Sequence, residues 1–132
     1  MIGNNFLVDT NIVIEVFKGN QEIADYLYKL PDIYISSIAL GELYTGINRV
    51  SNREKHLKRL NDFLKLTTIL NVDGETAEIY GELIADLYKL GKPIPTNDVW
   101  IAAIAIQYNL TLLTSDRHFE EINHLKSSYP TH

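Results

Sequence analysis

The sequence predicts an α/β domain with a short, mostly parallel β-sheet flanked by helices. Short apolar runs of strand character alternate along the chain with segments whose apolar residues recur at helical spacing. Parallel strands are expected because a helix between two strands carries the chain back to the end where the next strand starts. With 132 residues the chain is long enough to bury one core, so we expect a single domain over residues 1–132.

Four segments have strand character. Residues 6–8 (FLV) form a short apolar run, and residues 33–36 (IYIS) and 67–72 (TTILNV) are rich in β-branched side chains. Residues 111–114 (TLLT) form the last of the four. Short apolar runs of this kind are typical of strands that a parallel sheet buries on both faces.

Helical spacing of apolar residues marks the segments between these strands. The predicted helices span residues 12–17, 21–30, 38–50, 51–66, 75–90 and 100–106. Pro31 ends the second of them, Ser37 can cap the third and Gly91 closes the fifth. The last helix, WIAAIAI, is apolar on nearly every face, which predicts a central position in the fold.

The composition excludes several classes of protein. The absence of cysteine excludes a disulfide framework, a thiolate metal site and a cysteine nucleophile. No apolar run approaches the roughly 18 residues that span a bilayer, and the N-terminal MIGNNFL lacks the pattern of a signal peptide. We therefore expect a cytoplasmic protein with no membrane partner.

The charge is negative overall but unevenly distributed. A net charge of −5 argues against a protein that grips nucleic acid by bulk electrostatics. Half of the twelve Lys and Arg residues nevertheless lie in a basic segment, residues 49–65. They are Arg49, Arg53, Lys55, Lys58, Arg59 and Lys65. The basic segment is either a solvated helix face or a contact strip for RNA phosphates or for an acidic partner.

Four acidic residues interrupt or border strongly apolar segments. Asp9 follows the first strand, Asp116 follows the last, Glu42 lies within a helix between two leucines, and Asp98 opens the most apolar helix. Singly, each aspartate has an ordinary explanation as a cap or turn residue. A carboxylate against apolar surface is unfavourable unless something compensates it, and this is hardest to explain away for Glu42.

Together these acids predict a metal site. Ligands in parallel α/β sheets bind beyond the carboxyl ends of the strands, where these residues are expected to gather. Their mutual repulsion calls for a hard divalent cation such as Mg²⁺ or Mn²⁺. The hydroxyls of Thr10 and of Thr114 or Ser115 can hold the carboxylates, waters or phosphate oxygens around such an ion. Metal-assisted hydrolysis of a phosphodiester is the chemistry that this arrangement favours.

Three stretches carry a resemblance to a known family. They are FLVDTNIVIEVFKGN, YISSIALGELYTGI and GKPIPTNDVWIAAIAIQYNLTLLTSDRHFEEI, and their order and spacing cover nearly the whole chain. The chain resembles a PIN domain, in particular the VapC-type toxins of prokaryotic toxin–antitoxin pairs. The resemblance implies about five parallel strands and a metal-dependent endoribonuclease. It also implies a homodimer, or a dimer of toxin–antitoxin pairs, that a cognate antitoxin protein silences.

The resemblance also implies roles for particular residues. The family's acidic positions fall on Asp9, Glu42, Asp98 and Asp116, which would act as catalytic metal ligands. The family's polar residue near the first acid matches Thr10 or Asn11, and its threonine before the last acid matches Thr114. The last acidic position varies in the family, so neighbouring polar residues such as Ser115 are alternatives to Asp116. His118 and Phe119 match a common pair after this loop, interpreted as packing and loop anchoring.

Other functions were weighed against this one. A haloacid-dehalogenase-type phosphatase needs D-x-D where this chain has Asp9-Thr10-Asn11, and a receiver domain needs a paired acid and a lysine that are missing here. An RNA-processing or DNA nuclease on the PIN fold, or a non-catalytic interaction module, stays as the alternative.

For self-association we expect the helix over residues 75–90, with Tyr80 and Tyr88, to form the contact. Trp100 is expected in the core beside the site.

Overall fold

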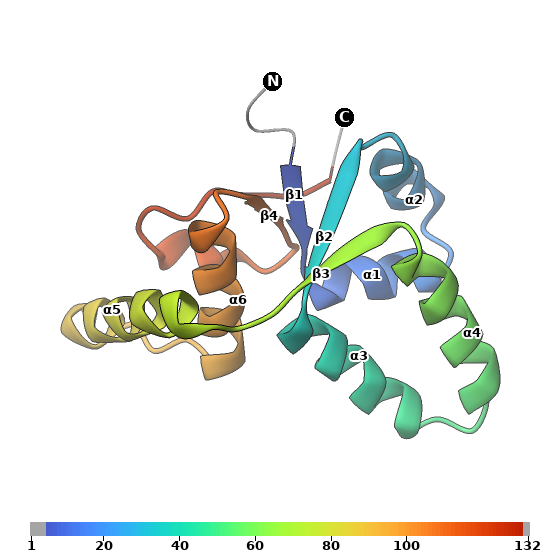
Figure 1. Ribbon diagram of the computed structural model, residues 1–132, viewed down its shortest axis with the longest axis horizontal. Coiled ribbons are helices and arrows are strands. Elements are labelled where there is room, and N and C mark those ends of the chain that lie inside the picture. Colours follow the sequence, from blue (N-terminus) through green and yellow to red (C-terminus); the bar gives the residue numbers. More distant parts are fainter. Residues whose placement is uncertain (1–4, 131–132) are drawn as a thin grey trace.

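The computed structural model describes residues 5–130, which form a five-stranded, all-parallel sheet in the order β3-β2-β1-β4-β5 (Figure 1). The strands are β1 (Asn5–Val8), β2 (Asp32–Ser36), β3 (Thr67–Leu70), β4 (Thr111–Leu113) and β5 (Ser127–Ser128). The predicted α/β class and the parallel sheet are confirmed. The prediction of one domain over residues 1–132 includes six terminal residues that lie outside the described part of the chain, and it stays a prediction.

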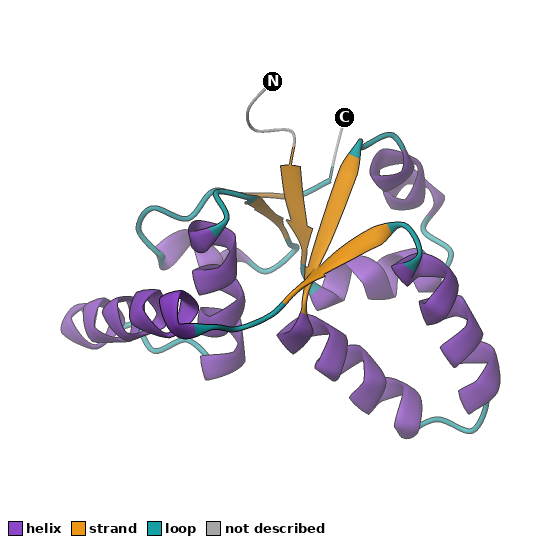
Figure 2. Cartoon of the chain, in the orientation of Figure 1, coloured by secondary structure: helices purple, strands orange, loops and turns teal. Residues whose placement is uncertain are grey.

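Six α-helices and a short 3-10 helix, η1, connect the strands (Figure 2). They are α1 (Thr10–Phe17), α2 (Gln21–Tyr28), α3 (Ser37–Asn48), α4 (Arg53–Leu64), α5 (Gly74–Leu90), α6 (Thr96–Gln107) and η1 (Arg117–Glu121). The six predicted helices are therefore confirmed, with shifted ends. The residue that caps α3 is Ser36 rather than Ser37, because its hydroxyl accepts the Ala39 N–H at 3.0 Å.

The two sides of the sheet carry different helices. In Figure 1, helices α1 to α4 lie on one side of the strands, and α5 and α6 lie on the other. Pairwise packing joins α1 to α2 and α3, and α5 to α6. Helix α6 buries six consecutive or near-consecutive residues between Val99 and Ala105, which confirms the central position that its sequence predicted.

The order of the strands determines where the site lies. The chain runs outward from β1 through β2 to β3, then returns to place β4 on the other side of β1. Val8 of β1 pairs with Leu113 of β4, so both strands end at the same level. The next backbone N–H, that of Asp9, donates to the Leu113 carbonyl at 2.9 Å. This is a topological switch point, the position where open α/β sheets bind their ligands.

Trp100 lies at the surface of α6 rather than in the core. It is half-buried, and its ring stacks on Tyr80 of α5 with centroids 3.8 Å apart and an interplanar angle of 11°. The expected core position was wrong because the helix turns this residue toward α5. The stacking also explains Tyr80 as a contact within the chain, whereas Tyr88 of α5 is 77% exposed.

Candidate active site

Asp9 is a buried carboxylate at the carboxyl end of the central strand β1, with 4% of its surface exposed. It is the N-cap of α1, and its Oδ1 accepts the Thr10 N–H at 2.8 Å. Its Oδ2 accepts from the Thr114 hydroxyl at 2.7 Å and from Asn11 Nδ2 at 3.1 Å. Burial raises the pKa of Asp9 above its ordinary value, although the bonds from Thr114 and Thr10 oppose that rise.

Thr10 joins Asp9 to Glu42. While its backbone N–H binds Asp9, its hydroxyl donates to Oε1 of Glu42 in α3 at 2.5 Å. The other Glu42 oxygen, Oε2, accepts from Asn97 Nδ2 of α6 at 3.4 Å. Helices α1, α3 and α6 therefore converge on the Glu42 carboxylate, which explains why a glutamate lies inside an otherwise apolar stretch.

The loop after β4 carries Asp116 and is tied to Asp9 through Thr114. The Thr114 hydroxyl donates to Asp9 and accepts the Asp116 N–H at 3.0 Å. Asn11 supports the same loop, because its Oδ1 accepts the Ser115 N–H at 3.1 Å. Of the two hydroxyls left open by the sequence, the structure brings that of Thr114 to the carboxylate, whereas Ser115 contributes its backbone.

His118 lies between the remaining two acids. Its Nε2 is 2.8 Å from Oδ2 of Asp98, and its Nδ1 is 2.8 Å from Oδ1 of Asp116. Both ring nitrogens therefore face carboxylates, and His118 bridges the two acids. Burial raises the pKa of Asp98, the hydrogen bond and charge of His118 lower it, and the charges of Glu42 and Asp116 raise it again, with a net rise.

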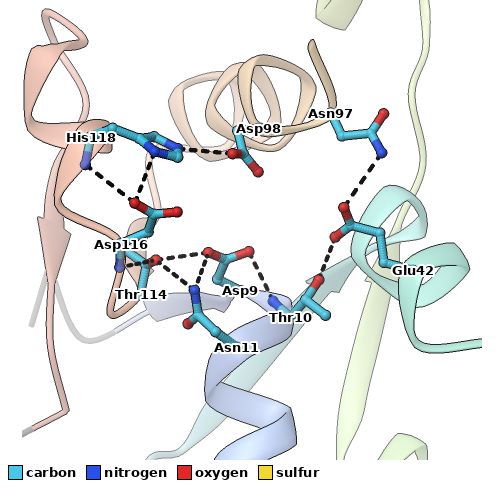
Figure 3. Close-up of polar contacts among 9 residues, drawn as sticks. All are labelled: Asp9, Thr10, Asn11, Glu42, Asn97, Asp98, Thr114, Asp116 and His118. Carbon is cyan, nitrogen blue, oxygen red and sulfur yellow. Dashed lines mark hydrogen bonds and ion pairs between the residues drawn. The ribbon is translucent and has the colours of Figure 1, made fainter. Parts of the chain in front are cut away.

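These contacts close into a ring, hereafter the acid ring (Figure 3). It runs Glu42–Thr10–Asp9–Thr114–Asp116–His118–Asp98 and returns to Glu42 through Asn97, the chain neighbour of Asp98. The four carboxylates face a common space in the picture. The ligand atoms of Asp98, Asp116 and His118 lie within 4.8 Å of one another, whereas Asp9 and Glu42 lie outside that group of three.

The chemistry of the acid ring fits a hard divalent cation. Its four acids offer oxygen donors, which are the ligands that Mg²⁺ and Mn²⁺ prefer. Two of the acids have raised pKa values, with burial as the first cause and neighbouring acids as a further one. A cation bound among them would offset both the cost of burying charged carboxylates and the repulsion between neighbouring acids. Fold and ring together define an α/β protein with an acidic edge whose donor atoms suit a divalent cation and metal-assisted hydrolysis.

Sequence reasoning missed two members of the ring. Asn97 was not among the predicted site residues, yet its amide contacts Glu42, 55 residues away in sequence. His118 was assigned to packing and loop anchoring, and it does contact the Phe119 ring, with centroids 4.9 Å apart. Its contact with two acids was not foreseen. The signal available in the sequence was the position of His118 two residues after Asp116 in the same loop.

Comparison with known proteins identifies the family. The family model for the PIN domain matches residues 6–125, so the chain belongs to the PIN-domain family. Ribonuclease VapC2 of Haemophilus influenzae is 34% identical over 125 residues, which cover 92% of this chain and 95% of that protein. Ribonuclease VapC1 of Rickettsia felis is 36% identical over 124 residues, with 91% and 92% covered. The resemblance to VapC-type proteins is thereby confirmed.

Solved structures agree with this assignment. VapBC2 from Rickettsia felis, bound to a DNA fragment from its promoter, superposes with a TM-score of 0.90 at 30% identity, covering 95% of this chain and 98% of that one. DNA-bound VapBC from Salmonella typhimurium superposes with a TM-score of 0.90 at 28% identity, covering 99% and 100%. Within residues 5–130 no helix is both long and apolar enough to cross a membrane.

Proposed function

We propose that this protein is a metal-dependent endoribonuclease that acts as the toxin of a toxin–antitoxin pair. The single observation that carries the proposal is the closed acid ring at the carboxyl edge of a PIN-domain sheet. The relatives named Ribonuclease VapC support RNA as the substrate class. Asp9, Glu42, Asp98 and Asp116 would hold one or two Mg²⁺ or Mn²⁺ ions.

The chain's own residues have distinct tasks in this reaction. Thr10, Asn11 and Thr114 fix the Asp9 carboxylate by hydrogen bonds to both of its oxygens. Thr10 and Asn97 orient Glu42 in the same way. The bound cation would lower the pKa of water and stabilise negative charge that develops on the phosphate. Water is the nucleophile in this proposal, because the acid ring holds no lysine or cysteine and its hydroxyls are engaged with carboxylates.

RNA cleavage tests the proposal directly. Purified protein is incubated with a pool of transfer and ribosomal RNA in Mg²⁺, in Mn²⁺ and in EDTA. Cleavage at discrete sites is expected, lost in EDTA and in the Asp9→Asn variant. Asp25→Asn on the exposed face of α2 is the matched control and should cut like the wild type. No cleavage of any RNA by the wild type, with no divalent-ion binding by calorimetry, would leave a non-catalytic binding module.

An apolar groove beside Glu42 supports an antitoxin as partner. It has a volume of about 370 Å³ and lies between α1, α3 and α4, with Ile14, Phe17 and Ile47 among its lining residues. The neighbouring VapBC structures are toxin–antitoxin complexes, which favours a protein segment as its occupant. Gly46 lines the groove and has open space at its Cβ position, so Gly46→Trp should fill it. Loss of antitoxin co-purification is expected for Gly46→Trp and not for the control Gly81→Trp on α5.

The basic segment over residues 49–65 fits the rim of this groove better than a path for RNA. Lys58 and Lys65 both pair with Asp62, at 2.9 and 3.6 Å. Arg59 lines the groove, donates to the Phe17 carbonyl at 2.8 Å and lies over the Phe17 ring. Much of the cationic charge is thus engaged within the chain, which supports a partner-facing or solvated surface.

We also propose self-association through α5. Tyr88 is 77% and Leu90 55% exposed near the end of this helix. Large apolar side chains left exposed at one end of a helix are candidates for a contact surface. Sedimentation of the wild type should give a homodimer, or a dimer of toxin–antitoxin pairs when the antitoxin is present. Tyr88→Glu with Leu90→Glu should give a monomer, and an unchanged dimer would place the interface elsewhere.

A further inference from the structure

A second cavity touches the acid ring on the side opposite the apolar groove. It has a volume of about 300 Å³ and opens at the carboxyl ends of β4 and β5. Thr114 and Asp116 belong both to its lining and to the acid ring. A molecule in this cavity would therefore lie next to the acids that are proposed to act on the scissile phosphate.

The lining of this cavity combines four kinds of group. Arg117 supplies a guanidinium, Tyr129 an aromatic ring, Ser127 and Ser128 hydroxyls, and Asp116 and Glu120 carboxylates. Single-stranded RNA is bound by the first three kinds, because cations meet its phosphates, aromatic rings stack on its bases and hydroxyls meet its sugars. A volume of about 300 Å³ is at the small end of ligand pockets, as a single nucleotide requires.

Arg117 and Tyr129 contribute little to the fold itself. The Arg117 side chain is 87% exposed, and its ion pair with Glu120 is long, at 3.9 Å. An exposed pair of this kind adds little stability. Tyr129 follows β5 directly and is 44% exposed. Both side chains are therefore available to a ligand.

Arg117 places one positive charge on this side of the acid ring, beside the carboxylates of Asp116 and Glu120. The protein has a net charge of −5, and the ring itself repels a polyanion. Arg117 follows Asp116 directly, so it brings positive charge to the edge of the ring. The cavity on the Glu42 side also has cations, Lys18 and Arg59, but its lining is mainly apolar, which suits a protein segment instead.

We propose that the cavity bounded by Asp116, Arg117 and Tyr129 binds the nucleotide next to the scissile phosphate. Arg117 contacts the backbone phosphate, and Tyr129 stacks on the base. The base that this cavity accepts then contributes to the choice of cleavage site. The assignment rests on the proposed ribonuclease function, because it takes RNA as the substrate.

Binding measurements test the assignment without requiring cleavage. Fluorescence anisotropy measures the binding of a labelled single-stranded hexaribonucleotide of mixed sequence in Mg²⁺. Every protein carries Asp9→Asn as the background, so that binding is measured without cleavage. Arg117→Ala and Tyr129→Ala are each expected to weaken binding about ten-fold, and Tyr129→Phe to retain it. Arg117→Ala should also flatten the slope of log K against log salt concentration by about 0.7, because one phosphate contact is lost. Tyr129→Ala should leave that slope unchanged.

Matched controls lie at the other end of the sheet. Tyr108 is 42% exposed and ends α6 just before β4 begins, and Lys29 is exposed just before β2 begins. Tyr108→Ala and Lys29→Ala should bind like the background protein. Thermal unfolding of each variant verifies that it is folded.

The outcomes separate this assignment from the proposed function. Wild-type cleavage together with unchanged binding by both cavity variants would overturn the assignment and leave the ribonuclease intact. Weaker binding by Lys55→Ala in the basic segment, with no effect of Arg117→Ala, would place RNA on α4 and would also overturn it. Loss of binding in the cavity variants without wild-type cleavage would support the cavity and refute the nuclease.

Discussion

The Thr114 hydroxyl donates a 2.7 Å hydrogen bond to the Asp9 carboxylate across 105 residues of sequence. Both groups are buried, and the same hydroxyl accepts the Asp116 N–H at 3.0 Å. One oxygen atom therefore couples the first and the last acid of the site. A valine of similar shape could not replace this threonine, since only a hydroxyl can donate to the Asp9 carboxylate and accept the Asp116 N–H.

Replacing Thr114 with valine should slow cleavage and move its pH dependence. The Thr114 bond lowers the pKa of Asp9, so its loss raises that pKa further. If cleavage requires ionised Asp9, the acidic limb of the rate profile shifts to higher pH. The rate near neutral pH should fall roughly ten- to hundred-fold, as for other groups that support metal ligands. A pH–rate profile with an unmoved acidic limb would show that Asp9 does not control it.

Asp9 should lower the stability of the ion-free protein as pH rises. Its folded pKa is raised above the ordinary value of 3.8, so the folded state binds this proton more tightly than the unfolded state. Stability is then lost as pH rises from 3.8 through the folded pKa. Over this pH window the wild type should lose stability, whereas Asp9→Asn should not. The unfolding free energy of the variant should therefore rise relative to that of the wild type. A hydrogen bond that is lost in Asp9→Asn changes the unfolding free energy by the same amount at every pH. The pH dependence of the difference therefore reports only the charge of Asp9.

Urea unfolding in EDTA at a series of pH values measures this difference. A divalent ion should cancel it in the wild type, because an ion that binds only the folded state adds stability by mass action. A difference that stays constant with pH would show that the Asp9 charge is already compensated without an ion.

His118→Ala should destabilise the ion-free protein more than the ion-loaded one. Without the imidazole, Asp98 and Asp116 face each other and Asp98 loses the contact that lowers its pKa. We expect a loss of about 1–3 kcal/mol in EDTA, the usual range when a buried polar group loses its partner. Addition of Mn²⁺ should shrink the loss. Equal losses with and without the ion would assign His118 to loop packing alone.

Tyr80 and Trp100 should show a coupling energy between α5 and α6. Their stacked rings lie 3.8 Å apart, and such pairs contribute about 0.5–1.5 kcal/mol beyond burial. A double-mutant cycle with Tyr80→Ala and Trp100→Ala, followed by circular dichroism, measures this energy. A value near zero would mean that the two helices are held by their buried aliphatic residues without help from the ring pair.

The fold was largely predictable because periodicity and short apolar runs are local signals. The fifth strand was expected only from the resemblance to PIN domains, because Ser127 and Ser128 are too short and too polar a pair to be recognised as a strand. Hydrogen bonding to β4 creates it, with Leu113 opposite Ser128. The position of Trp100 was predicted wrongly for a different reason. Nearly every face of its helix is apolar, so the spacing of apolar residues does not indicate which face is exposed.

The four acids could be identified because each stands out against an apolar background. Two of the side chains that contact these acids could not be predicted in this way. Asn97 and His118 lie in polar surroundings, where many side chains have no partner at all. Only the packing of α6 against α3, and of the loop after β4 against α6, brings these two residues to Glu42 and Asp98. Such long-range pairs leave no trace in the spacing of residues along one chain.

The order in which the chain leaves the ribosome decides when the acid ring can form. The acid ring needs Asp9 from the first strand and His118 from beyond the fourth, so no shorter N-terminal fragment contains it. Strand β4 also has to insert beside β1 after β2 and β3 have been made. Under the proposed ribonuclease function, a nascent chain therefore gains its site only near the end of synthesis, and premature termination before residue 118 should yield an inactive product. The antitoxin of the proposed function would then have nothing to silence until this ring closes.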